Sequence, residues 1–247
     1  MPLKPSARPR TAEETAAAEL REAIVRGDLP PGAAIRQDAT ARELGVSVIP
    51  VREALKTLAS EGLIVYRPQR GYTVAELRPE SLQGIFRVRE LLEGEAERIA
   101  LRRANARTTA LMRAAMREQA VAARAGDVVE VIAANREFHF ALFDLCDNPL
   151  LLRYVRQTWD TLDPHRAVLY RRTLAAGQPR GQTEQVRGDH QSIVDAIAAG
   201  AAEQAAQLLR EHRCGGHAAL ARYLGISAEA DSPQSGGGDG GDGRGMM

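Results

Sequence analysis

The chain has 247 residues, of which 44% are hydrophobic and only 4% aromatic, and its formal net charge is +1. This length predicts two domains, and the near-neutral charge excludes a polybasic protein, so affinity for nucleic acid must come from a local patch. We see no apolar run near the roughly 20 residues of a membrane span and no hydrophobic signal peptide. The two cysteines, Cys146 and Cys214, form no CxxC motif, which indicates reduced thiols in a cytoplasmic protein.

The first residues, 1–10, are rich in Pro and Arg and are predicted to be a disordered arm. Residues 11–26 show the apolar spacing of a helix, and a turn rich in Gly and Pro follows over 27–32. We expect residues 11–76 to form one domain.

The stretch 37–76 carries the clearest pattern in the chain. Gly45 separates two helical segments, and Gly62 is placed to end the second of them. The second helix has Val51, Ala54, Leu55 and Leu58 on one apolar face. The pattern predicts, in order, helices over 38–44 and 49–60 and strands over 63–66 and 72–75. Two helices joined by a tight turn and followed by a hairpin make a winged helix-turn-helix, in which the second helix enters the DNA major groove.

Basic side chains lie where such a motif would meet DNA. Arg52 and Lys56 are four residues apart and share the helix face opposite the apolar one. Arginine can read guanine with two donors, and Arg70-Gly71 at the hairpin tip could enter a minor groove. Residues 47–72 hold four basic and two acidic side chains. The alternative is that Arg52 and Lys56 only solvate the helix or pair with neighbouring glutamates.

The string LGVSVIPVREALKTLASEGLIVYRPQRGYTV resembles the GntR family of bacterial transcription regulators. The resemblance rests on PVREAL, L-x-x-EGL and RGY-x-V. The family usually has Arg and Thr after the Ser, where this chain has Val48 and Ile49, so one DNA contact is expected to be lost or moved. The candidate DNA-binding residues are Arg36, Thr40, Ser47, Val48, Arg52, Lys56, Arg70 and Gly71.

From residue 80 to 224 only helical patterns occur. Their breaks outline helices near 80–104, 108–125, 128–146, 149–175, 182–199 and 201–224, which predicts a bundle. The second domain is expected over 77–226, and the Gly-rich tail 227–247 is predicted to be disordered. The predicted fold class is therefore mainly α, with an N-terminal winged helix-turn-helix and a C-terminal all-α six-helix bundle.

The second domain resembles the FCD ligand-binding domain of the FadR-like GntR subfamily, most clearly over 86–100, 135–151 and 188–212. The resemblance implies a divalent metal site (Zn, Ni or Mn) whose candidate ligands are Asn135, His139, His190 and His212. The family has Asp where this chain has Asn135, and a neutral amide should weaken metal binding. The alternative is that these are hydrogen-bonded core residues. His165 and His217 are expected to be structural or exposed.

The resemblance also implies a small carboxylate effector bound near the metal. Arg89 matches a pocket arginine of the family, and a guanidinium suits bidentate carboxylate binding. The alternative for Arg89 is an ion pair with Glu93, four residues away. Arg166 and Tyr170 are further candidates by position, although a solvated helix face would explain them as well.

These features predict a ligand-responsive transcription regulator, a repressor by the family's usual logic. It would bind a pseudo-palindromic operator in double-stranded DNA as a homodimer and would have no membrane partner. We expect no enzyme activity, because no acidic pair, nucleophile elbow or phosphate loop accompanies the histidines. The alternatives are a metal-dependent hydrolase-like bundle fused to a DNA-binding domain, or a DNA-binding protein with a degenerate, metal-free bundle.

Overall fold

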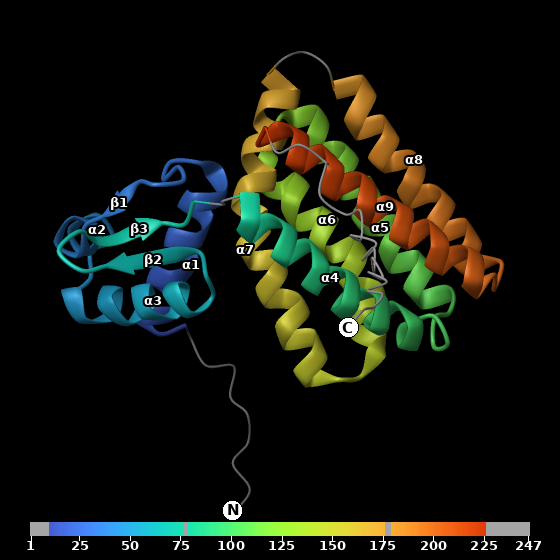
Figure 1. Ribbon diagram of the computed structural model, residues 1–247, viewed down its shortest axis with the longest axis horizontal. Helices are drawn as coiled ribbons and strands as arrows, with labels where there is room; N and C mark the ends of the chain where they lie inside the picture. Colours follow the sequence, from blue (N-terminus) through green and yellow to red (C-terminus); the bar gives the residue numbers. More distant parts are fainter. Residues whose placement is uncertain (1–9, 77–78, 176–178, 226–247) are drawn as a thin grey trace, which may run out of the picture.

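The computed structural model describes residues 10–76, 79–175 and 179–225, which form two domains side by side (Figure 1). The predicted N-terminal arm, apart from Arg10, and the predicted Gly-rich tail lie outside the described residues. The smaller domain contains, in order, α1 (Ala12–Arg26), β1 (Ala34–Ile35), α2 (Gln37–Glu43), α3 (Val48–Ser60), β2 (Ile64–Arg67) and β3 (Gly71–Val74).

Helix α1 begins and ends at residues suited to those positions. The Thr11 hydroxyl accepts a hydrogen bond from the Glu14 amide, and the Glu14 carboxylate accepts one from the Thr11 amide, forming a capping box. Gly27 ends the helix with a φ of 83°, a left-handed conformation that favours glycine. Between these ends, Leu20 and Ile24 are buried against α3, so α1 forms one wall of the domain core.

The wing is a three-stranded antiparallel sheet in the order β1-β3-β2. β2 and β3 match the predicted hairpin, but the strands extend one residue further toward the tip, where Arg67 pairs with Gly71. β1 was not predicted, because two residues are too short for an alternating pattern to show. It pairs through Ala34 with Thr73 and through Ile35 with Tyr72.

Helix α3 holds the small domain together through its apolar face. Val51, Ala54, Leu55 and Leu58 are fully buried and pack with α1 and the sheet in one hydrophobic core. Their burial leaves the opposite face of α3 for solvent, as the spacing predicts.

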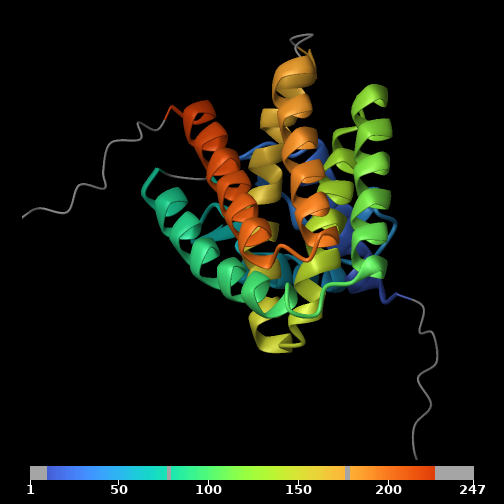
Figure 2. The same ribbon diagram turned by 90° about the vertical axis from the view of Figure 1, so that its right-hand side faces the viewer.

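The larger domain is a helical bundle (Figures 1 and 2). Its elements are α4 (Pro79–Ala100), α5 (Ala106–Ala125), α6 (Val128–Phe143), a short 3-10 helix η1 (Asp144–Cys146), α7 (Pro149–Ala175), α8 (Pro179–Ala198) and α9 (Ala202–Tyr223). The predicted fold class is confirmed. Several helix bounds differ by a few residues. α4 ends at Ala100 and not at residue 104, and α6 tightens into η1 after Phe143. α5 begins at Ala106 and not at residue 108, and α8 begins at Pro179 and not at residue 182. Among the described residues, no helix combines the length and apolarity that crossing a membrane requires.

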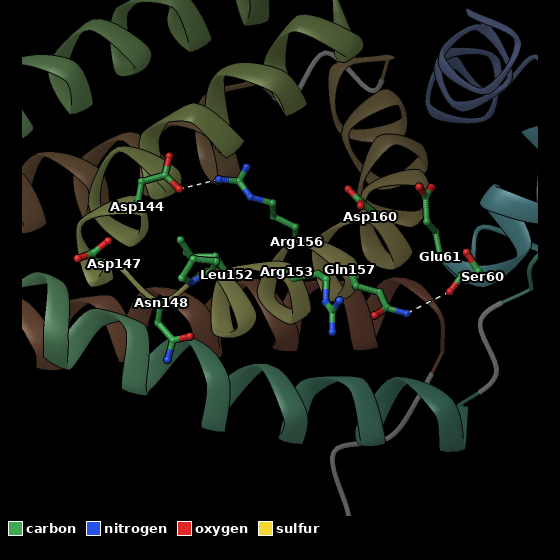
Figure 3. A pocket seen from close by; sticks show the side chains of 11 residues that line it. Ser60, Glu61, Asp144, Asp147, Asn148, Leu152, Arg153, Arg156, Gln157 and Asp160 are labelled. Atoms are coloured by element: carbon green, nitrogen blue, oxygen red, sulfur yellow. Dashed lines mark hydrogen bonds and ion pairs between the residues drawn. The ribbon is translucent and has the colours of Figure 1, made fainter. Parts of the chain in front are cut away.

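Helix α7 lies against the smaller domain and joins the two halves of the molecule (Figure 1). The Gln157 amide donates to the Ser60 carbonyl at 3.2 Å (Figure 3), and the Thr161 hydroxyl donates to the Glu61 carbonyl at 3.2 Å. Arg171 Nη2 donates to the Val25 carbonyl at 3.1 Å. These carbonyls lie at the C-terminal ends of α3 and α1, where helix acceptors lack intrahelical partners. One bundle helix therefore donates to the C-terminal ends of α1 and α3, two of the three helices of the smaller domain.

Candidate functional site

The outer face of α3 presents polar and basic side chains. Arg52 and Lys56 are both exposed. Lys56 forms an ion pair with Glu53 at 2.8 Å, as the alternative interpretation of this residue predicts. Arg52 makes a long hydrogen bond of 3.4 Å to Gln37 on α2. Exposed ion pairs of this kind contribute little and are easily exchanged. Ser47 is the helix N-cap and makes no side-chain capping bond, so its hydroxyl is free to meet a phosphate.

Two of the candidate DNA-binding residues are poorly placed for contact. Thr40 is buried in α2, with 9% of its surface exposed. Val48 is half-buried and packs against the domain core. By contrast Ile49, which we did not select, is 69% exposed in the first turn of α3. The sequence contained a signal for Ile49 as a DNA-facing residue. It is aliphatic, lies three positions before Arg52 and does not belong to the buried face of the helix.

The wing tip exposes an arginine. Arg70 lies in the turn between β2 and β3, and its backbone amide donates to the Arg67 carbonyl at 3.0 Å. The turn needs positive φ at Gln69 (66°) and at Gly71 (74°), and glycine takes that conformation without strain. Arg36, at the N-cap of α2, is also exposed.

Inside the bundle, three histidines from three helices meet. His139 comes from α6, His190 from α8 and His212 from α9, and one ring nitrogen from each lies within 4.8 Å of the others. The Nε2 atoms of His190 and His212 are 3.2 Å apart. Two imidazoles bound to one tetrahedral zinc ion at its usual bond length would have nitrogens about 3.3 Å apart. The spacing of this pair therefore fits a shared divalent ion.

The environment favours the neutral form of His139 and His190. Burial, reinforced by His212 and His190, lowers the pKa of His139 well below its usual value. Burial and the neighbouring His212 do the same to the pKa of His190. Neutral imidazole is the form that binds metals.

One acidic side chain stands beside the set, although it is not the acidic pair whose absence the sequence indicated. Asp189 lies 3.1 Å from Nδ1 of His212. A carboxylate on the far ring nitrogen fixes the tautomer and turns Nε2 toward the metal position. Its place immediately before His190 in the sequence was the signal that we missed.

Two of the three histidines, His139 and His212, border a small cavity of about 60 Å³. Asn135, Arg89, Arg166 and Tyr170 all line it, so the structure brings the metal and effector candidates together. Arg89 pairs with Glu93 through Nε, as the alternative interpretation holds. Within the described residues, however, Nη1 of Arg89 and Nη1 of Arg166 are buried without a hydrogen-bond partner, and the latter has only an ion pair with Asp163 at 3.6 Å. A buried cationic donor without a hydrogen bond is costly, which suits an anionic ligand.

Further charged residues belong to the cavity wall, and of these Glu97 and Arg213 were not among the candidates. Glu93 accepts a hydrogen bond from the indole of Trp159 at 2.8 Å, and Arg213 donates to Glu97 at 2.6 Å. Burial raises the pKa of Glu97 to about 8, against the opposing effect of Arg213. Buried glutamates on helix α4 could not be told from surface ones, because the segment FRVRELLEGEAERIA has charges on every side.

The raised pKa of Glu97 has a consequence for stability. The native protein holds a proton that the unfolded chain releases above about pH 4.5, so this contribution to stability is lost as the pH rises toward 8. We expect urea denaturation to show wild-type stability falling by a few kcal/mol between about pH 5 and 9 relative to Glu97→Gln, at roughly 1.4 kcal/mol per pKa unit. Parallel pH profiles for the two proteins would contradict the assignment.

The two histidines set aside in the sequence are packed within the bundle. His217 stacks on Phe86 with ring centroids 3.9 Å apart, and His165 is 5% exposed. Neither belongs to the group of three histidines whose ring nitrogens converge. Both cysteines are free, Cys146 buried and Cys214 exposed.

A winged helix-turn-helix joined to a helical bundle with an internal cavity defines a class of bacterial DNA-binding regulators. Residues 12–74 match the bacterial regulatory proteins of the gntR family, and residues 84–213 match the FCD domain. The chain belongs to the GntR family of transcriptional regulators and carries an FCD domain. This class is non-enzymatic.

Individual relatives are transcriptional regulators as well. The chain is 30% identical over 226 residues to a probable D-xylose utilization operon transcriptional repressor of Paenarthrobacter nicotinovorans, covering 90% of this chain and 93% of that one. It is 30% identical over 152 residues to the regulator McbR of Escherichia coli, covering 62% and 69%. The solved structure of E. coli McbR/YncC, at 24% identity, shares the fold with a TM-score of 0.75 over 87% of this chain and all of that one.

Proposed function

We propose that this regulator is a cytoplasmic repressor whose affinity for its operator changes when a small carboxylate, held with the help of a divalent metal, binds in the bundle. It would bind a pseudo-palindromic operator as a homodimer, with two recognition helices about one DNA turn apart. The observation that carries the proposal is the position of α7. This helix lines the cavity with Arg166 and Tyr170 and also contacts α1 and α3 of the DNA-binding domain.

The proposed operator contacts come from α3 and the wing. Arg52 would read base edges in the major groove, while Ser47, Lys56 and Arg36 would contact phosphates. Arg70 and Gly71 at the wing tip would approach the minor groove. Because Thr40 and Val48 are largely covered by their own domain, we leave them out of this interface.

Ile49 adds an apolar contact to this proposed interface. Its exposed side chain projects from the first turn of α3, where recognition helices meet base edges, and an aliphatic group can contact the methyl of thymine.

Replacing Ile49 by alanine should therefore weaken operator binding by tenfold or more, since burying three carbons contributes up to roughly 2 kcal/mol in each of the two protomers. Fluorescence anisotropy with operators carrying T·A or C·G at each position would locate the effect. Leu111→Ala, which shortens an exposed aliphatic side chain on α5, is the control. Equal losses for both variants, or no loss at any T·A position, would contradict this role.

The residues present fit a divalent metal, with His139, His190 and His212 as the nitrogen ligands and Asn135 as a neutral oxygen ligand. When bound, the metal would supply a Lewis-acidic centre for a carboxylate oxygen. Because Asn135 brings no negative charge, the ion keeps more of its positive charge for an anionic ligand. Arg89, Arg166 and Tyr170 would hold the remaining carboxylate oxygen, since they border the same cavity.

Contacts beside the cavity offer a path for the response. Tyr170 lies on the cavity wall and packs in one cluster with Val25 of α1. The next residue, Arg171, donates to the Val25 carbonyl, and a Cβ at Gly27 would lie only 2.4 Å from its guanidinium. A ligand that moves Tyr170 would therefore act on the end of α1 through this cluster and through the neighbouring Arg171.

Arg171→Ala should reduce the effect of carboxylate on operator affinity while leaving carboxylate binding unchanged. Coupling between two sites typically corresponds to 5- to 150-fold in affinity, and we expect most of it to be lost. Operator titrations with and without acetate measure the coupling, and calorimetry measures acetate binding. Arg153→Ala, an exposed residue of the same helix, is the control. Full coupling in Arg171→Ala would rule out this path.

A further inference from the structure

A groove on the outside of the bundle leads to the histidine cavity. It runs between α8 and α9 and has a volume of about 850 Å³, a size typical of small-molecule sites. Its walls mix apolar side chains, such as Leu208 and Ala219, with polar ones, such as Gln185 and Ser192. The groove and the inner cavity share the residues Leu169, Val186, His212 and Gly216. The two spaces are therefore neighbours on either side of His212.

The inner cavity is too small for most organic acids. Its 60 Å³ corresponds to room for on the order of four water molecules. That space accommodates a carboxylate group and little else. Any larger part of a ligand whose acid group lies at the histidines has to extend past His212 and Gly216 into the groove.

The two spaces also differ in charge. The inner wall carries three arginines, Arg89, Arg166 and Arg213, against the two glutamates Glu93 and Glu97, and Nη1 of Arg89 is buried there without a hydrogen-bond partner. The groove is lined by the carboxylates of Asp189 and Glu211, with Arg222 as its basic residue. An anionic group is favoured inside and disfavoured in the groove, because like charges at close range repel.

We propose that the groove between α8 and α9 binds the body of the effector, and that the effector is a monocarboxylate with an uncharged, partly apolar body. This inference rests on the proposed carboxylate site. It adds the class of ligand and a second subsite, in which Gly216 forms the passage between the two spaces.

Calorimetric titration of the zinc-loaded protein with acetate, butyrate, hexanoate and adipate tests the proposal. Each methylene that enters the groove should tighten binding by roughly three- to fourfold, so hexanoate should bind far more tightly than acetate. Adipate has the same length as hexanoate and should bind at least tenfold more weakly than it, because its second carboxylate meets Asp189 and Glu211. Equal affinities for acetate and hexanoate would overturn the groove proposal alone. No binding of any acid would overturn the carboxylate site and the groove with it.

Two glycine substitutions locate the subsite. Gly215 lines the groove but not the inner cavity, and Gly188 lines neither of them. A Cβ added at Gly215 or at Gly188 meets no atom within 4 Å, and leucine has a higher helix propensity than glycine, so both variants should fold. Gly215→Leu should fill part of the groove and reduce the gain from acetate to hexanoate, with acetate affinity within about threefold of wild type. Gly188→Leu should match the wild type. A chain-length gain that is unchanged in Gly215→Leu, or that falls equally in Gly188→Leu, would contradict the assignment.

Discussion

Arg52→Ala should abolish specific operator binding while leaving the fold intact. Arg52 is exposed on α3 and shares no packing with the buried face formed by Val51 and Leu55. A lost bidentate base contact costs about 1–3 kcal/mol of discrimination, and in a homodimer two contacts are lost, so the fall in affinity should reach 100-fold or more. Circular dichroism should show an unchanged melting temperature.

The measurement is anisotropy with an operator selected by the wild-type protein from random DNA, compared with unrelated DNA of the same length. Lys56→Ala is the matched control, because a phosphate contact weakens both DNAs alike and flattens the salt dependence. If Arg52→Ala lowers affinity for both DNAs equally, Arg52 does not read bases.

Chelation should lower the melting temperature of the metal-loaded wild type but not that of His212→Gln. A metal that binds only the native state stabilises it by mass action, by about 4 kcal/mol at a thousandfold excess over the dissociation constant. Glutamine keeps a donor for Asp189 and changes volume little, and His212 lies at the cavity edge with 11% of its side chain exposed, so the variant should fold.

Asn135→Asp gives the opposite test of the same site. Aspartate has the shape of asparagine and adds a negative charge beside the dication, so metal affinity should rise. Calorimetry with zinc, nickel and manganese measures this change. Equal chelator effects in wild type and His212→Gln, together with no metal response in Asn135→Asp, would leave the histidines as core hydrogen-bonding residues in a metal-free bundle.

The sequence was most informative where local periodicity and the packed structure agree. The apolar spacing of Val51, Ala54, Leu55 and Leu58 predicted the buried face of α3. An amphipathic helix has a single apolar stripe, and that stripe has to pack against the domain core. The three histidines were selected through the family resemblance, and the structure brings their ring nitrogens together.

The failures have a common physical cause, which is that burial depends on partners distant in sequence. Val48 and Ile49 are adjacent aliphatic residues, yet α3 packs the first against its domain and exposes the second. Glutamates usually lie at the surface, yet Glu93 and Glu97 are buried because Trp159 and Arg213 meet them from other helices. The contacts of α7 with α1 and α3 involve carbonyl acceptors, which no side-chain pattern reveals.

The central claim is that a ligand in the bundle controls DNA binding, and its most direct test is an operator titration of the zinc-loaded wild type in the presence and absence of saturating hexanoate. We predict a change in operator affinity of 5- to 150-fold, toward weaker binding for a repressor released by its effector. The change should vanish in Arg89→Gln, which removes a cationic group from the cavity wall. An operator affinity that hexanoate leaves unchanged, in protein shown by calorimetry to bind it, would contradict the account.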